Sequence, residues 1–393
     1  MVKKSDRIPF QSFRSSENYS LALRRLNGNY EVFRRNTLQK ECLKKLSEWH
    51  PAQKHFLTQS ATAGLMMVAD SIDFSHGDEI IVPSFTFVSA LNPFVRRGVN
   101  LVFVPANENT LGPDLDSIRR AITPQTKAIM LMHYGGIPCA RYDDLLLLHT
   151  LAKANGIVVI EDAATCFGSS IGEHPLGSVS DCSVISFDIT KHITAVNGGL
   201  CLVGSPSLAN KLTQAYHNGT NRSEFEKGEV DYYDWNSLGS KYAMNALSAS
   251  ILSSQLDMAH EVLHQLKQLS LHYINHLEGF AQEVSRHIFP SAQLMSNGHL
   301  FAWLAKDAGE QKQLIDFLDA KGIESHSHYR SLHSSPMSKG SGIGREAGDF
   351  EFTQNLPFRI VRLPIHSGLS IDDVDRVAEA IKLFYSNRTH KKS

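Results

Sequence analysis

The chain has 393 residues, of which 42% are hydrophobic and 20% are charged. This composition and length are those of a globular protein with two or three domains, or with one large domain and a smaller partner, and they exclude disordered, collagen-like and disulfide-scaffold chains. The 39 Lys and Arg residues nearly balance the 40 Asp and Glu residues, so the net charge is −1. Proteins that bind nucleic acids or anionic membranes usually carry a basic excess, so we expect neither kind of partner.

Five cysteines are spread along the chain, and none forms the CxxC pair of a zinc ribbon or a thioredoxin-like protein. Several lie inside apolar runs, which indicates buried free thiols in a reducing compartment. The basic N-terminus is not followed by the apolar core of a signal peptide, and no apolar stretch approaches ~20 residues. We therefore expect a cytoplasmic protein. The cysteines are Cys42, Cys139, Cys166, Cys182 and Cys201.

Between about residues 55 and 205, short runs of branched apolar residues alternate with segments of helical length. The runs are continuously apolar, as in strands buried on both faces of a sheet. This alternation predicts an α/β fold with a mostly parallel central sheet and helices on both faces. The predicted strands are 80–82, 101–104, 128–132, 157–160 and 184–187, and the predicted helices are 65–69, 115–121 after Asp114, and 142–154 before Gly156.

After about residue 245 the pattern becomes that of a smaller α+β domain. We expect one long helix or a broken pair at 246–284, a strand near 300–304, a helix at 313–321, and a final helix at 370–384 capped by Ser370 and Asp373. The segment 334–348 is rich in Ser and Gly and predicts a mobile loop. The expected domains are an N-terminal arm and helix at 1–50, a large domain at 51–245, and a linking helix with a small domain at 246–393.

Ligands of open α/β sheets bind beyond the carboxyl ends of the strands, so the residues after each run are candidates for chemistry. The run 157–160 leads into Glu161 and Asp162, where a carboxylate either meets a ligand or caps a helix. The run 184–187 leads to Lys191. Burial lowers the pKa of a lysine and frees its lone pair for a carbonyl carbon, although a solvated loop lysine is the commoner case.

Two further features concern phosphate and ring binding. Residues 60–64, SATAG, precede an apolar helix, and their small side chains expose backbone N–H groups that suit an anion; a simple cap by Ser60 explains the same pattern. The phenylalanines of PSFTF at 83–87 either stack on a planar ligand or pack in the core. Together, the four features match a planar phosphorylated aldehyde with a basic ring nitrogen, which needs a phosphate cradle, a stacking ring, an acid and an amine.

A competing motif is His260-Glu261-Val262-Leu263-His264, which matches the HExxH zinc signature on a predicted helix. No convincing third ligand follows, since His272 lies two turns further on. We therefore interpret both histidines as part of a helix surface and expect no metal site.

Motifs from about residue 27 to 384 resemble those of the DegT/DnrJ/StrS nucleotide-sugar aminotransferases, which are fold-type I pyridoxal phosphate enzymes. The segment 219–257 resembles the subgroup that makes dTDP-4-amino-4,6-dideoxygalactose for cell-envelope polysaccharides such as the O antigen of lipopolysaccharide. The other motifs are SATAGL at 60–65, GDEIIVPSFTFVSALNPFVRRG at 77–98, HYGG at 133–136, EDAA at 161–164, SFDITK at 186–191 and SHYRSLHSSP at 327–336.

The resemblance implies roles for particular residues. Lys191 would bind the aldehyde of pyridoxal 5′-phosphate covalently, Asp162 would pair with the pyridine nitrogen, and Phe87 would stack on the ring. The remaining cofactor-binding residues would be Ala61, Thr62 and Ser186 at the phosphate, together with Thr165.

The same resemblance implies a substrate site and a partner. His328 and Tyr329 would lie near the sugar nucleotide. Lys241 lies in the segment that reaches the phosphate of the neighbouring subunit in this family, which implies a homodimer with shared active sites.

The implied activity is transfer of the amino group of glutamate to C4 of a dTDP-4-keto-6-deoxyhexose, with the galacto product favoured. Three residues depart from the family pattern: Asp188 replaces a histidine, Asn197 stands where a glutamate is usual, and Thr165 replaces glutamine or histidine. The alternatives are a pyridoxal or pyridoxamine phosphate-dependent sugar dehydratase, and a cofactor-binding paralogue with altered catalysis and no transaminase activity.

Overall fold

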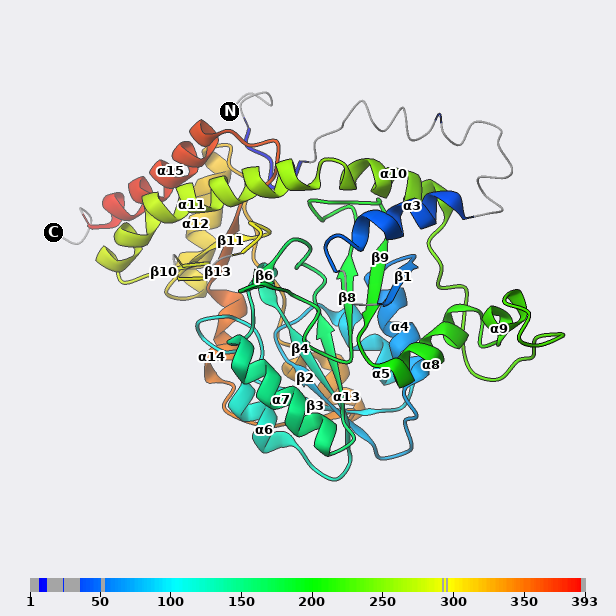
Figure 1. Ribbon diagram of the computed structural model, residues 1–393. Helices are drawn as coiled ribbons and strands as arrows, with labels where there is room; N and C mark the ends of the chain where they lie inside the picture. Colours follow the sequence, from blue (N-terminus) through cyan, green and yellow to red (C-terminus); the bar gives the residue numbers. More distant parts are fainter. Residues whose placement is uncertain are drawn as a thin grey trace.

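A computed structural model describes residues 7–12, 24, 36–50, 54–291, 293–294 and 296–389. The remainder of the predicted N-terminal arm lies outside the described residues. The chain forms a large α/β/α unit and a smaller α+β unit joined by a long helix, and the smaller unit contains the C-terminal helix (Figure 1). Within the described part of the chain, no helix is long and apolar enough to cross a membrane.

The centre of the large unit is an eight-stranded sheet with the order β1-β9-β8-β5-β4-β2-β3-β12. The strand β9 runs antiparallel to both of its neighbours, and all other neighbouring pairs are parallel. The five strands predicted from apolar runs are all present. The bounds are β1 (Lys54–Thr58), β2 (Glu79–Pro83), β3 (Asn100–Val104), β4 (Thr126–Met132), β5 (Val158–Asp162), β8 (Cys182–Ser186), β9 (Gly199–Val203) and β12 (Gly344–Glu346), with a hairpin of β6 (Ser170–Ile171) and β7 (His174–Pro175) beside the sheet.

Helices cover both faces of this sheet because successive strand residues point to opposite faces. In β2, Ile80 and Val82 belong to the core beneath α4, α5 and α8, whereas Ile81 belongs to the core beneath α6 and α7. The bounds are α4 (Ala61–Ser71), α5 (Asn92–Arg96), α6 (Leu115–Ala121), α7 (Tyr142–Ala154), α8 (Pro206–Tyr216) and α9 (Arg222–Glu226), with 3-10 turns η2 (Val88–Ala90) and η3 (Tyr134–Gly136). Asp114 caps α6 by accepting a hydrogen bond from the backbone N–H of Ser117, as predicted.

The segment 246–284 is the broken pair of helices, α10 (Ala246–Leu256) and α11 (Ala259–Glu283). The shorter α10 packs on α3 (Thr37–Leu46), and α11 continues into the small unit and packs on α15 (Ile371–Thr389) (Figure 1). Ser370 and Asp373 form the predicted reciprocal cap of α15. An antiparallel sheet of β10 (His287–Phe289), β11 (Phe301–Leu304) and β13 (Ile360–Leu363), with α12 (Ala308–Ala320) and α14 (Glu351–Asn355), completes the unit.

The prediction of a loop at 334–348 is wrong. This segment contains α13 (Pro336–Ser341) and the edge strand β12, which pairs in parallel with β3; the turns η4 (Leu332–Ser334) and η5 (Leu356–Phe358) lie on either side. Its Ser- and Gly-rich composition carries no apolar signal because β12 is exposed along its length. The edge is held instead by backbone pairing and by the ion pair of Arg345 with Glu79. The division of domains at residue 245 stays a prediction, although β12 shows that the C-terminal part contributes to the large sheet.

Candidate active site

A cavity of about 490 Å³ lies at the carboxyl ends of the parallel strands. Its walls come from the segments that follow β2, β4, β5 and β8, from the N-terminus of α4, from Arg362 on β13 and from Phe10 and Gln11. This is the position in which open α/β sheets bind ligands. Segments from both ends of the chain therefore close a single site.

The N-terminus of α4 forms one end of this cavity. Ser60 caps the helix by accepting a hydrogen bond from the N–H of Ala63, while Ala61 and Thr62 line the cavity. The first N–H groups of a helix have no partner within the helix, and together with the helix dipole they favour an anion. Gly199 starts β9 against this turn, and a Cβ there would lie 2.4 Å from the carbonyl carbon of Ser60. Only glycine lets the strand approach the anion-binding turn so closely.

Two consecutive carboxylates at the end of β5 have different surroundings because they point to opposite faces of the sheet. Glu161 is fully buried; it accepts hydrogen bonds from His133 Nε2 at 2.8 Å and from the N–H groups of Gly177 and Val179. Burial opposes ionisation, but these hydrogen bonds hold the pKa of Glu161 below its ordinary value. Glu161 is therefore a buried structural anion that anchors the end of β5.

Asp162, in contrast, faces the cavity. Its Oδ1 accepts a hydrogen bond from the N–H of Ala164 at 3.1 Å. Burial raises the pKa of Asp162, and this effect outweighs the hydrogen bond from Ala164 and the charge of Lys191, which both lower it. A cation placed against this carboxylate would restore its charged form.

Lys191 follows β8 in a tight turn and lines the same cavity. Asp188 shapes this turn: its Oδ1 accepts hydrogen bonds from the N–H and the hydroxyl of Thr190, and its carbonyl accepts from the N–H of Lys191. Burial lowers the pKa of Lys191, while the charges of Asp162 and Asp188 oppose this shift. A neutral amine is a nucleophile, so burial favours attack on a carbonyl carbon.

Two hydroxyl residues complete the inner wall of the cavity. Ser186, the last residue of β8, accepts a hydrogen bond from the N–H of Asp188 at 3.3 Å. The hydroxyl of Thr165 donates to the carbonyl of His133 and accepts from the N–H of Gly136, each at 3.1 Å. Thr165 therefore ties the segment after β5 to the segment after β4, and both of its hydrogen bonds are made within the protein.

Aromatic side chains form the opposite wall. Phe87 is 54% exposed, and its ring centroid lies 5.8 Å from that of Tyr329. His328 stacks on Tyr329 with a centroid distance of 3.7 Å, and its Nδ1 is hydrogen-bonded to the hydroxyl of Tyr134. Burial holds the pKa of His328 well below its ordinary value, so this imidazole is neutral at physiological pH.

Arg362 and His299 also line the cavity, although the sequence analysis did not identify either residue. Arg362 is a charged residue in the otherwise apolar run IVRL of β13, which is a signal that could have indicated it. Its guanidinium lies 4.7 Å from the ring of Phe10, and its Nε is buried without a hydrogen-bond partner in the described part of the chain. Burial lowers the pKa of Arg362, and the neighbouring Tyr134 and Tyr329 oppose this shift.

All but one of the residues predicted for the site line this cavity. The exception is Lys241, which is exposed and whose carbonyl accepts a hydrogen bond from Gln59. The residues brought together are Ala61, Thr62, Phe87, Asp162, Thr165, Ser186, Lys191, His328 and Tyr329. Their individual roles, and that of Lys241 across a subunit interface, stay predictions.

The sequence profile of the DegT/DnrJ/EryC1/StrS aminotransferase family matches residues 32–382. The chain belongs to this family. It is a sugar aminotransferase with the fold-type I architecture, and its cofactor is pyridoxal 5′-phosphate.

Two kinds of relative support this assignment. The dTDP-4-dehydro-2,3,6-trideoxy-D-glucose 4-aminotransferase of Saccharopolyspora spinosa is 28% identical over 334 residues, which are 84% of this chain and 83% of the relative. The fold is shared with Spr1654 from Streptococcus pneumoniae in its PMP form, which is 24% identical with a TM-score of 0.83 over 98% of this chain and all of that one. It is also shared with the aminotransferase PseC of Helicobacter pylori, 19% identical with a TM-score of 0.83 over 97% and 100% of the two chains.

The cavity of this aminotransferase fits the family's cofactor. An anion-binding helix end, a carboxylate and an amine face the same volume, as a phosphate, a pyridine nitrogen and an aldehyde require. The HExxH histidines do not contribute to it: His260 stacks on Trp49 and both His260 and His264 are exposed on α11, as predicted.

We expect Asp188→Asn to lower the pH at which Lys191 captures the cofactor. The aspartate charge raises the pKa of this amine, so its removal yields the free amine at lower pH, while the amide oxygen still accepts the hydrogen bonds of Thr190. The measurement is the rate at which cofactor-depleted protein recovers bound pyridoxal phosphate, followed by absorbance as a function of pH.

The control for this prediction is Thr190→Val, which removes a hydrogen bond to Asp188 but keeps its charge. The pH midpoint of cofactor recovery should be the same in Thr190→Val as in the wild-type protein. An Asp188→Asn midpoint at or above the wild-type value would contradict the electrostatic coupling of Asp188 with Lys191.

Proposed function

We propose that this aminotransferase moves the amino group of glutamate to C4 of a dTDP-4-keto-6-deoxyhexose. The product is a dTDP-4-amino-4,6-dideoxyhexose, with the galacto isomer favoured, and it supplies cell-envelope polysaccharide synthesis. The observation that carries the proposal is the pairing of Lys191 with Asp162 in one cavity, as amino-group transfer on this cofactor requires. The 4-aminotransferase relative and the fold shared with DesI, solved with its TDP-sugar product at 23% identity and a TM-score of 0.79, support the class of substrate.

Each cavity residue has a role in this proposal. When bound, the cofactor supplies an electron sink for the carbanion formed at the donor α-carbon. Asp162 keeps the ring nitrogen protonated, because its buried carboxylate accepts a hydrogen bond from the protonated nitrogen. Lys191 would act as the general base that accepts the proton from the α-carbon of glutamate and then as the general acid that returns it, and the same two roles in reverse order would serve the keto-sugar.

The other residues hold the cofactor in the orientation that Lys191 needs. The N–H groups of Ala61 and Thr62 and the hydroxyls of Thr62 and Ser186 bind the phosphate, and Phe87 covers one face of the ring. Thr165 fixes the segment beside the ring through its two backbone hydrogen bonds. His328 and Tyr329 contact the sugar nucleotide.

Arg362 binds an anionic group of the amino donor. It is a partly buried guanidinium in the cavity wall whose Nε has no hydrogen-bond partner among the described residues. A carboxylate of glutamate matches its planar donors. The half-buried histidines beside it, His299 and His328, have pKa values held well below the ordinary value by desolvation, so they supply no competing charge.

The proposed assembly is a cytoplasmic homodimer with shared active sites. The segment around α9 projects from the body of the molecule (Figure 1) and exposes large apolar side chains, including Trp235 at 79% and Tyr232 at 70%. Large exposed apolar patches usually mark protein contacts. In this proposal the segment covers a second subunit and Lys241 reaches the phosphate there. The cysteines are free and buried, which suits a reducing compartment.

The departures from the family pattern leave this machinery in place. Asp188 stabilises the turn of Lys191, and Thr165 joins two loops. The third departure, Asn197, follows a strained residue. Val196 has a φ of 66°, a left-handed conformation that costs a β-branched residue about 1–2 kcal/mol. The alternative of a dehydratase is disfavoured because such relatives replace the lysine, and the mass of the sugar product distinguishes the two reactions.

Mixing the protein with L-glutamate should convert the bound cofactor to its amine form, because in this proposal Lys191 moves the proton and Asp162 keeps the ring nitrogen protonated. Loss of the aldehyde-linked absorbance band measures this half-reaction. Lys191→Ala should lose it by several orders of magnitude. A panel of keto-sugar nucleotides then identifies the acceptor, and NMR of the product gives its C4 configuration.

Bound cofactor without any half-reaction in the wild-type protein would support the altered paralogue. An undiminished rate in Lys191→Ala would exclude the assigned role of this amine. A deoxygenated sugar in place of an amino sugar would establish the dehydratase.

Arg362→Gln should raise the KM for glutamate about tenfold to a hundredfold, since hydrogen bonds to charged groups contribute about 1.5–3 kcal/mol. Cofactor binding should change little. Steady-state kinetics with a fixed keto-sugar concentration provide the measurement. The matched control is Arg330→Gln, because Arg330 is exposed and packs on Phe358 outside the cavity. Equal KM values for the two variants would refute donor binding by Arg362.

Mixing the inactive variants Lys191→Ala and Lys241→Ala should restore activity if sites are shared. Random exchange of subunits makes half of the dimers mixed, and each mixed dimer has one intact site out of two. Activity should therefore reach about a quarter of the wild-type value. The control mixture of Lys191→Ala with Asp162→Asn should stay inactive, because both residues line the cavity of one chain. No recovery in the first mixture would place Lys241 outside the partner's site.

A further inference from the structure

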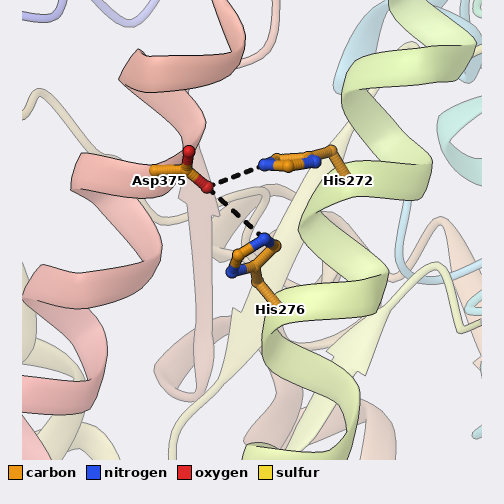
Figure 2. Close-up of side chains that lie close together, drawn as sticks. All are labelled: His272, His276 and Asp375. Carbon is orange, nitrogen blue, oxygen red and sulfur yellow. Dashed lines mark hydrogen bonds and ion pairs between the residues drawn. The ribbon is translucent and has the colours of Figure 1, made fainter.

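A group of three metal-ligand side chains lies in the small unit, away from the residues of the active site. It consists of His272 and His276 on α11 and Asp375 on α15, and their ligand atoms all lie within 4.8 Å of one another. Figure 2 shows both imidazole rings turned toward one carboxylate across the gap between the two helices. This group is on the same helix as the HExxH sequence but is separate from it.

The spacing of the two histidines brings them to the same face of α11, because residues four apart on a helix are neighbours. The Nε2 atom of His272 lies 2.7 Å from Asp375 Oδ1, and the Nε2 atom of His276 lies 3.4 Å from the same oxygen. Both imidazole nitrogens therefore lie beside the same carboxylate oxygen, and all three ligand atoms lie within 4.8 Å of one another. The helices α11 and α15 are packed against each other, so this convergence does not depend on a loop.

These distances suit a tetrahedral ion. Ligand atoms bound to zinc at about 2.0–2.2 Å lie about 3.3–3.6 Å apart. The His276–Asp375 distance is already in this range, and the His272–Asp375 pair reaches it by opening less than 1 Å. Rotation about side-chain torsions supplies such a movement at a partly exposed site.

Exposure and ligand type narrow the choice of ion. The side chains of His272, His276 and Asp375 are 25%, 40% and 36% exposed, so an ion can enter from solvent and keep water as a fourth ligand. Imidazole nitrogen suits zinc and other divalent transition metals, whereas calcium and magnesium prefer oxygen ligands throughout.

We propose that His272, His276 and Asp375 form a binding site for a divalent transition metal ion of the zinc type, which links the long helix α11 to the C-terminal helix α15. An ion bound there stabilises the small unit, because the three ligands come together only in the folded chain. None of the three ligand residues lines the active-site cavity.

The test is equilibrium dialysis of the full-length, cofactor-loaded protein without an affinity tag against zinc chloride, with metal counted by mass spectrometry. We expect one zinc ion per chain in the wild-type protein and at least tenfold weaker binding in His276→Gln. Cobalt chloride should produce the visible absorption bands of four-coordinate cobalt in the wild-type protein but not in His276→Gln. The variant keeps the hydrogen bond between His272 and Asp375, so it should remain folded.

The matched control is His264→Gln, which removes an exposed histidine from the same helix, also four residues from another histidine. It should bind zinc like the wild-type protein. Absence of saturable one-to-one binding would show that the cluster is only an ion pair. Equal binding by His276→Gln and His264→Gln would show that zinc is held by the cofactor or by unrelated surface groups, and it would overturn the proposal.

Discussion

The electrostatic balance between Lys191 and Asp162 is the constraint on which the active site depends. Burial disfavours the charged form of each group, and the opposite charge of the other favours it. The result is an amine whose pKa is lowered and a carboxylate whose pKa is raised, both facing one cavity. Neither property belongs to the isolated side chain. Both arise because the carboxyl ends of the adjacent parallel strands β5 and β8 bring the two groups to one cavity.

The rest of the large unit holds these two strand ends in register. Glu161 anchors β5 on the opposite face through His133 and two backbone N–H groups, and Asp188 fixes the turn after β8. Gly199 permits β9 to approach the first turn of α4, which brings the anion-binding N–H groups to the same cavity. These buried polar groups hold the cavity residues in place. Each buried charge must itself be paired or hydrogen-bonded, because an unpaired buried charge is destabilising.

The small unit contributes part of the cavity wall. Arg362, His299 and Tyr329 come from its strands and loops, and Phe10 closes the cavity beside the guanidinium. Segments more than 300 residues apart therefore share one volume. In the proposed function, residues at the strand ends of the large unit carry the cofactor chemistry. Residues of the small unit select the molecule that reacts.

The amino-acid sequence alone determined the α/β class, the five apolar strands and the positions of Asp162 and Lys191 after two of these strands, because continuous apolar runs and the residues that follow them are local signals. Among the features it missed are β1, β9, Arg362 and the edge strand β12. The edge strand has no apolar pattern since it is exposed, and the arginine becomes informative only when β13 packs against the cavity. Only the tertiary structure decided which distant segments meet, as with Arg362 and Phe10, or His272 and Asp375. The reason is that such meetings depend on packing between elements rather than on residue order.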